Sequence, residues 1–333
     1  MKIIKFSKSY KDVFNLKKDF YNNNNNNLKK ILRINQSYIK QKKRLKCKTC
    51  KSNLTKTIFY SHKVNYLICK KCGHLNGQSV ETKKFLNNLY LKNEGKNYSR
   101  NYLTNYIDRV KKIYIPKVNF LTTVIKKKID VLDIGCGSGH FVKALELKKI
   151  NSTGYDPNLQ LIQLGGKFLD KNKIFNKEIN NCKNEIINSK HNVLSAIGVL
   201  EHLENPIEIF ELFIKSNKEY FYISVPLFSL SVFIENIFKN IYPRHLGGPH
   251  THLYSKKSLY FIAKKFRLQI LGEWWFGTDF PDLYRSLLLS LNYKDKKFIN
   301  YFNKIFLRNI NEFQSILDRE KSSSEVHMVF KKK

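Results

Sequence analysis

Short apolar runs alternate with segments of helical spacing over much of the chain. β-rich apolar runs predict strands at 129–133, 152–155, 192–199 and 219–225. Helical spacing predicts helices at 141–148 and 159–169, and a further helix that follows the capping residue Asn205 with Pro206 at its first position. Strands that alternate with helices in this way predict parallel β-α-β units and an open, doubly wound α/β sheet.

The last third of the chain continues the pattern and then changes direction. Ser255 caps a predicted helix that runs to Phe266, and the segment 268–274 is strand-like. Residues 276–325 have mostly helical spacing, and 326–330 alternate like a final strand. We therefore expect the sheet to end in an antiparallel, hairpin-like return.

The first 128 residues show three different patterns. Residues 1–44 are basic, rich in Asn and weakly periodic, 45–80 contain four cysteines, and 81–128 have helical spacing. In the third segment, Tyr98, Tyr102 and Tyr106 share one helical face, which either packs in a core or covers a ligand site. The predicted organisation is a basic leader at 1–44, a cysteine module at 45–80, a helical connector at 81–128, and an α/β domain at 129–333 with a helical insert at about 276–325.

Four of the six cysteines form two Cys-x-x-Cys pairs, made of Cys47, Cys50, Cys69 and Cys72. Two such pairs at this separation are typical of a zinc ribbon, in which two tight turns bring four thiolates to one tetrahedral Zn²⁺ ion. The runs at 57–60 and 66–68 predict the hairpin strands of the ribbon. We predict a structural Zn²⁺ site, and the alternative is four unrelated buried cysteines.

The high net charge is only weak evidence for a nucleic-acid partner. The chain has 61 Lys and Arg against 26 Asp and Glu, a formal charge of +35, which suits a polyanion such as nucleic acid. The excess is Lys rather than Arg, and Asn is abundant beside it, with a run at 22–27. AT-rich codon usage produces that composition without any partner, whereas base recognition favours Arg.

Neither a membrane span nor a secretory signal is evident. The most apolar stretch, 227–242, is interrupted by Glu235 and Lys239, and a transmembrane helix needs about 20 largely apolar residues. The first 20 residues are charged throughout. We expect a cytoplasmic protein.

Residues 131–139 contain a candidate ligand-binding loop. They read Val-Leu-Asp-Ile-Gly-Cys-Gly-Ser-Gly, a strand that enters a glycine-rich turn before a helix, and glycine lets the backbone bend sharply and a ligand approach closely. A dinucleotide fingerprint would need glycine at position 140, which is His140. Asp156 closes the second predicted strand, where an acidic side chain can accept hydrogen bonds from the ribose hydroxyls of an adenosine.

These residues resemble the class I S-adenosylmethionine-dependent methyltransferases, which have an acidic residue and G-x-G-x-G after strand one and an acidic residue at the end of strand two. Residues 197–206, Ile-Gly-Val-Leu-Glu-His-Leu-Glu-Asn-Pro, look like the segment after strand four in the branch that methylates small molecules, lipids and sugars. The resemblance implies a seven-stranded, Rossmann-like methyltransferase sheet. The cofactor-binding residues that it implies are Asp133, Gly135, Cys136, Gly137, Gly139, Asp156 and Gly198.

A zinc ribbon ahead of this domain is similar to the order found in sugar C-methyltransferases, which act on nucleotide-linked deoxysugars and have relatives among surface-polysaccharide enzymes. This likeness implies a sugar, a nucleotide sugar or another small glycoconjugate precursor as the methyl acceptor. Those enzymes carry a further large C-terminal domain, whereas only 58 residues follow Trp275. Both oxygen and carbon methylation therefore remain open.

Candidate catalytic residues follow the fourth and fifth predicted strands. Glu201 and His202 come after the fourth strand, and the loop 242–255 after the fifth contains three histidines, an arginine and two glycines. In similar methyltransferases a histidine five residues before the helix-opening serine faces the substrate, which corresponds to His250. Histidine is suited to taking up the acceptor proton near neutral pH. We predict catalytic roles for His250, His202, Glu201 and His252, against the alternative of structural histidines.

Two other functions remain open. An RNA methyltransferase that recognises its substrate through the zinc ribbon fits the net charge, although the predicted α/β domain at 129–333 lacks the Asn-Pro-Pro-Tyr and Pro-Cys or Thr-Cys motifs of many such enzymes. A catalytically inactive methyltransferase-like binding module is the second alternative, against which the intact Asp133, glycine loop and Asp156 weigh. The sequence does not indicate an oligomeric state.

Overall fold

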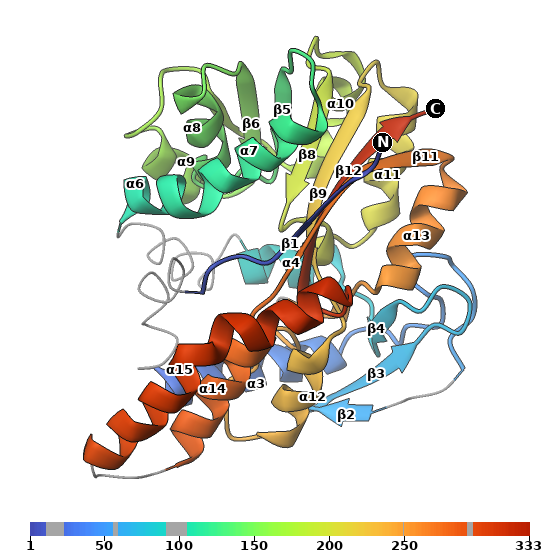
Figure 1. The fold of residues 1–333 in the computed structure, drawn as a ribbon. Coiled ribbons are helices and arrows are strands. Elements are labelled where there is room, and N and C mark those ends of the chain that lie inside the picture. The colour runs from blue at the N-terminus through green and yellow to red at the C-terminus, as the bar shows by residue number, and fades with distance from the viewer. Residues whose placement is uncertain (11–22, 56–58, 91–104, 249, 292–295) are drawn as a thin grey trace.

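The computed structural model describes residues 1–10, 23–55, 59–90, 105–248, 250–291 and 296–333. Its centre is an eight-stranded sheet with the order β1-β11-β12-β9-β8-β5-β6-β7 (Figure 1). The strands are β1 (Ile3–Phe6), β5 (Val131–Ile134), β6 (Ser152–Asp156), β7 (Ile174–Asn176), β8 (Val193–Ile197), β9 (Tyr220–Pro226), β11 (Leu268–Phe276) and β12 (Glu325–Lys332). The sheet is mostly parallel, and only β12 runs antiparallel to its neighbours β9 and β11. The expected doubly wound α/β sheet is confirmed.

The helices cover both faces of this sheet. One face packs against α7 (Ile115–Val124) and α8 (His140–Leu147), and the other packs against α10 (Lys183–Asn188), α11 (Pro206–Lys215) and α13 (Lys256–Lys265). Helix α9 (Leu159–Gly165) lies beside β6 and β7. The strands read as continuous apolar runs because the sheet is buried on both faces. Ser255 caps α13 with its hydroxyl as predicted, in a reciprocal pair with Ser258.

An eighth strand extends the seven-stranded sheet that the sequence predicts. Strand β1 comes from the segment interpreted above as a leader, and it pairs in parallel with β11, with Ile3 opposite Gly272 and Phe6 opposite Trp275. The same segment contributes α3 (Asn24–Ile39), which packs under the loop that follows β9. The described parts of this segment therefore contribute a strand to the central sheet and a helix that packs on the loop after β9.

A second sheet of four strands has the order β10-β4-β3-β2. It consists of β2 (Phe59–Ser61), β3 (Val64–Ile68), β4 (Leu75–Gly77) and β10 (His252–Leu253). The first three belong to the cysteine module, whereas β10 comes from the loop after β9 and pairs with β4 through His252 opposite Asn76. The cysteine module and the histidine-containing loop therefore share one sheet.

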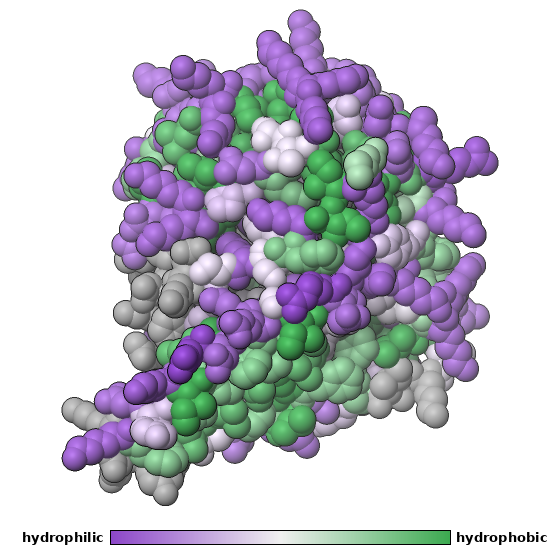
Figure 2. All heavy atoms as spheres, viewed as in Figure 1, coloured by the Kyte–Doolittle hydropathy of each residue, from purple (hydrophilic) through white to green (hydrophobic). Residues whose placement is uncertain are grey.

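The predicted helical insert forms α14 (Asp279–Ser290) and α15 (Lys296–Arg319), which pack on each other, while α14 also packs on α12 (Leu230–Ile237). In Figure 2 most of the view is hydrophilic, and hydrophobic side chains gather over these three helices. The exposed members include Phe233 and Ile237 on α12 and Tyr301 and Ile305 on α15. Among the residues that the structure describes, no helix combines the length and apolar character needed to cross a bilayer.

Candidate active site

The glycine loop after β5 has the backbone that its sequence predicts. Gly135, Gly137 and Gly139 have φ angles of 71°, 57° and 72°, a left-handed region in which other residues are strained. A Cβ at Gly135 would lie 2.5 Å from Val199 Cγ2, and one at Gly139 would lie 2.5 Å from Leu169 Cδ1. A Cβ at Gly137 would meet only Leu161 Cδ1, at 4.0 Å. The loop is therefore closed by packing at both ends and has space at its middle glycine.

Asp156 lies directly beside this loop. Its Oδ2 accepts the N–H of Gly137 at 2.9 Å, and its Oδ1 accepts the N–H of Asn158 at 2.8 Å. Burial raises the pKa of Asp156, and these two N–H donors oppose the change. The structure thus brings together the glycine turn and the acidic end of the second strand, which is the arrangement that an adenosine ligand needs.

Asp133 is the second buried carboxylate of this region, at the end of β5. It is 2% exposed and accepts the Ser195 hydroxyl at 2.6 Å. Burial raises its pKa to about 7, while the Ser195 hydrogen bond acts in the opposite direction. The side chain of Cys136 packs in a small core cluster with Val142 and Leu169, so the loop offers a ligand the backbone of this residue.

Aromatic rings pack over the glycine loop. Tyr106 stacks on His140 with ring centroids 4.2 Å apart and on Phe168 at 4.0 Å, and its hydroxyl donates to the carbonyl of Ser138 at 2.9 Å. The sequence leaves open whether Tyr98, Tyr102 and Tyr106 pack in a core or cover a ligand site, and the first two lie outside the described residues. Sequence reasoning gave no role to His140, whose ring is part of this stack.

Lys117, on α7, is another buried residue that sequence reasoning missed. It is 7% exposed, and burial lowers its pKa, against the charges of Glu325, Asp133 and Glu201. The only sequence signal is a lysine within the apolar helix that follows Pro116. Its position near these carboxylates offsets part of the negative charge at this end of the sheet.

Glu201, His202 and His250 form a compact cluster at the carboxyl ends of β8 and β9. Their candidate ligand atoms all lie within 4.8 Å of one another, and the two imidazole centroids are 4.9 Å apart. Gly198, with φ of 68°, precedes the short 3₁₀ helix η4 (Leu200–His202), and a Cβ there would lie 3.7 Å from Glu201 Oε1. The structure therefore brings together three of the four predicted catalytic residues.

Glu201 is the most buried member of the cluster, at 4% exposure. Its Oε2 has no hydrogen-bond partner among the described residues, and burial raises its pKa to about 8. Tyr90, at the end of α4 (Lys83–Tyr90), bonds through its hydroxyl to His202 Nδ1 at 2.7 Å, and its carbonyl accepts the Asn158 side chain at 3.1 Å. Tyr90 therefore connects the cluster with the Asp156 turn.

The loop that contains His250 is held by buried polar contacts. Glu235, 3% exposed on α12, accepts three consecutive backbone N–H groups, from Arg244 at 2.6 Å, His245 at 2.7 Å and Leu246 at 3.0 Å. Asn35 of α3 accepts the N–H of Gly248 at 2.7 Å. In the sequence, Glu235 is recognisable only as a charge that interrupts the apolar stretch 227–242. In the structure it fixes the backbone that leads to His250.

His252, the fourth predicted catalytic residue, lies outside the Glu201–His202–His250 cluster. It is fully buried in β10, and its Nδ1 lies 2.9 Å from Nε2 of His74, which belongs to the cysteine module. Tyr254 packs edge-on to both rings, with centroids 5.6 Å from His252 and 4.8 Å from His74. The described contacts of His252 thus join the histidine loop to the ribbon.

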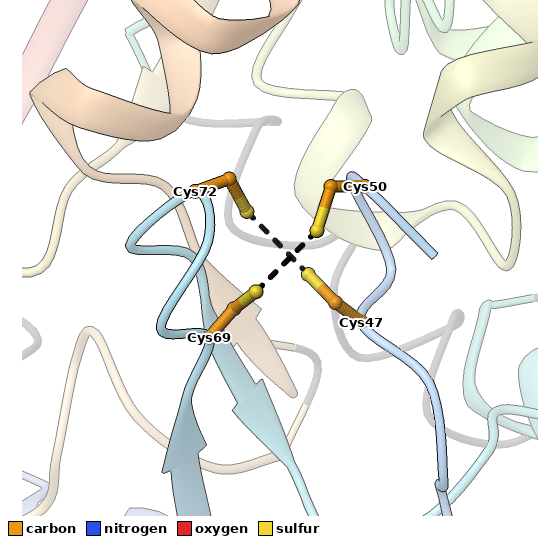
Figure 3. Close-up of side chains that lie close together, drawn as sticks. All are labelled: Cys47, Cys50, Cys69 and Cys72. Atoms are coloured by element: carbon orange, nitrogen blue, oxygen red, sulfur yellow. Dashed lines mark hydrogen bonds between the residues drawn. The ribbon is translucent and has the colours of Figure 1, made fainter. Parts of the chain in front are cut away.

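The four cysteines of the ribbon converge on one point (Figure 3). Cys47 Sγ lies 3.6 Å from Cys72 Sγ, Cys50 Sγ lies 3.4 Å from Cys69 Sγ, and all four sulfurs are within 4.8 Å of one another. Four thiolates about 2.3 Å from one Zn²⁺ would be separated by ~3.8 Å. No disulfide joins the described cysteines. The donor set and its dimensions fit a tetrahedral zinc site.

Comparison with known proteins gives the family. A family model described as a methyltransferase domain matches residues 106–272, half of the chain. No curated protein matches the chain. The family-model match covers β5 to β9, including the glycine loop, Asp156 and the Glu201–His202 segment. The chain belongs to the methyltransferase-domain family, and it is an S-adenosylmethionine-dependent methyltransferase.

Several solved structures are similar to the chain in part. Magnesium protoporphyrin IX methyltransferase from Synechocystis PCC 6803, with bound SAH, is 10% identical, with a TM-score of 0.49 over 76% of this chain and 100% of that one. The plantazolicin methyltransferase BpumL, also with SAH, is 17% identical, with a TM-score of 0.45 over 74% and 94%. The methyltransferase domain of a bacterial CtHen1 is 15% identical, with a TM-score of 0.42 over 67% and 99%.

Proposed function

We propose that this methyltransferase transfers the methyl group of S-adenosylmethionine to an oxygen or carbon of a sugar, a nucleotide sugar or another small glycoconjugate precursor, in the cytoplasm and within polysaccharide synthesis. The observation that carries the proposal is the Glu201–His202–His250 cluster beside Gly198. A hydroxyl, or a carbon next to a ketone, must lose a proton to accept a methyl cation. We place the acceptor at this cluster.

We propose that Asp133, the glycine loop, Asp156 and Gly198 seat the cofactor. When bound, S-adenosylmethionine supplies a sulfonium methyl group whose leaving group is already activated. The buried Asp156 carboxylate is placed to accept the ribose hydroxyls, and the space beside Gly137 leaves room for a ligand to approach the backbone. The chain itself must then align the two reactants and exclude water.

Within this proposal His250, His202 and Glu201 act on the acceptor, and His252 supports the loop that presents His250. The His252–His74 contact and the β10–β4 pairing favour that division, because both join the loop to the ribbon. We also propose that Cys47, Cys50, Cys69 and Cys72 hold a structural Zn²⁺. A closed set of four thiolates leaves no ligand position for a substrate.

The test is transfer of labelled methyl from S-adenosylmethionine to a panel of nucleotide sugars, glycans and RNA. We expect labelling of a sugar acceptor, and a loss of turnover in His250→Asn that leaves the affinity for S-adenosylhomocysteine nearly unchanged. His191→Asn is a matched control. His191 lies just before β8, at the end of that strand opposite to His202, and its Nδ1 lies 3.1 Å from Ser189 Oγ. Labelling confined to RNA would refute the sugar proposal and support the alternative suggested by the charge of +35.

A further inference from the structure

The Glu201–His202–His250 cluster has the composition of a metal site as well as that of a proton acceptor. One carboxylate and two imidazoles are a donor set that suits divalent transition metals. The three candidate ligand atoms lie within 4.8 Å of one another, and Nε2 of His202 is 3.8 Å from Oε1 of Glu201. Ligands about 2.0–2.2 Å from one ion are separated by ~3–3.5 Å, so small side-chain rotations close the gap.

The second observation is the environment of Glu201. A carboxylate that is 4% exposed and whose Oε2 has no hydrogen-bond partner within the described part of the chain is costly to bury. Oε1 of Glu201 lies 3.8 Å from Nε2 of His202, and the charge of Lys117 acts on Glu201 from farther away. A cation placed between Glu201 and the two imidazoles would give this carboxylate a partner of opposite charge.

Groups outside the cluster hold both imidazoles in place. The Tyr90 hydroxyl bonds to His202 Nδ1 at 2.7 Å, which leaves Nε2 as the nitrogen that lies near Glu201. The backbone of Arg244 and His245, fixed by Glu235, contacts the His250 ring. Metal-binding histidines commonly have one ring nitrogen held by such a partner, which orients the other toward the ion.

We propose that Glu201, His202 and His250 bind one divalent cation, separate from the cysteine cluster, and that this cation binds the oxygen of the methyl acceptor. Three protein ligands leave open positions on the ion. An acceptor with two neighbouring oxygens, such as a sugar diol, can occupy two of them. The role on the acceptor rests on the proposed function, whereas binding of the cation does not.

The chemical step balances without any further reactant. Coordination lowers the pKa of the acceptor hydroxyl, its O–H bond breaks, and the proton passes to solvent. An oxygen lone pair forms the new bond to the methyl carbon while the S–CH₃ bond breaks. The sulfur keeps that electron pair, and the products are the methyl ether and S-adenosylhomocysteine.

Mn²⁺ tests the site directly, because it prefers carboxylate and imidazole to thiolate ligands. The full chain, with zinc at the cysteines, is titrated with Mn²⁺ and the free ion is followed by electron paramagnetic resonance. We expect one Mn²⁺ per chain, and an affinity that is at least about tenfold weaker in Glu201→Gln and in His250→Asn. His191→Asn should bind Mn²⁺ like the wild type, and zinc content serves as the check that each variant is folded.

A second titration with Co²⁺ distinguishes this site from the ribbon. Co²⁺ held by oxygen and nitrogen gives weak visible bands without the intense sulfur-to-metal band of a thiolate site. The proposal is overturned if the wild type binds no Mn²⁺ at millimolar concentration, if folded Glu201→Gln and His250→Asn bind it as tightly as the wild type, or if bound Co²⁺ shows only the sulfur band. Mn²⁺ binding without methylation of any sugar would refute the proposed acceptor and keep the cation site.

Discussion

The Asp156 carboxylate offers the sharpest test of how the cofactor is held. It is 8% exposed, and each of its oxygens already accepts one backbone N–H, at 2.8 and 2.9 Å. If both ribose hydroxyls also donate to it, Asp156→Ala removes two hydrogen bonds to a charged group, each worth about 1.5–3 kcal/mol. A loss of about 3 kcal/mol corresponds to a roughly 100-fold weaker affinity.

Isothermal titration calorimetry with S-adenosylhomocysteine measures this change without any knowledge of the acceptor. Asp170→Ala is a control, since Asp170 is an exposed carboxylate after α9. This change should leave the affinity unchanged. Asp156→Ala also leaves the N–H groups of Gly137 and Asn158 without an acceptor, so its thermal midpoint should fall as well. An affinity within about twofold of the wild type in the folded variant would refute the role of Asp156.

Three further predictions concern stability and metal content. Burial alone would raise the pKa of Glu273, but hydrogen bonds from Lys2, Lys321 and Tyr260 lower it to about 2. Glu273→Gln should therefore cost about 3 kcal/mol of unfolding free energy at pH 7. Denaturant titration should show this difference vanishing as the pH falls toward 2. Burial raises the pKa of Asp133 to about 7, so the folded state binds the proton more tightly than the unfolded state. Asp133→Asn should therefore raise the thermal midpoint at pH 8, and this gain should disappear as the pH approaches 4. An equal gain at both pH values would contradict the reasoning. Cys72→Ser should lose zinc, measured by plasma mass spectrometry, and lower the thermal midpoint, whereas Cys182→Ser, at a buried cysteine outside the cluster, should keep its zinc.

The sequence predicts the central sheet and the glycine loop well because both depend on local patterns. Buried parallel strands are continuous apolar runs, and the left-handed φ angles at 135, 137 and 139 can be inferred from the glycines themselves. The proximity of Asp156 follows from the same topology, since adjacent parallel strands end at one edge of the sheet. These features need no knowledge of distant contacts.

Other features could not be predicted from local patterns. Glu235 looks like a stray charge in an apolar run, and its function becomes visible only when the N–H groups of residues 244–246 lie against it. Strand β1 has four residues, one of them Lys5, and no alternation that distinguishes it from its basic surroundings. Its position is set by its partner β11, which is far away in the sequence at Leu268–Phe276.

The pairing of β1 with β11 has a consequence for how the molecule folds. Strand β1 lies at the sheet edge, and its partner β11, which begins at Leu268, is synthesised much later. Contacts between such distant segments form slowly, because a long loop must close first. During synthesis, Ile3–Phe6 must remain without its partner while the interior strands assemble. Closure of this edge is expected to be a late step, and nascent chains that end before Trp275 cannot complete it.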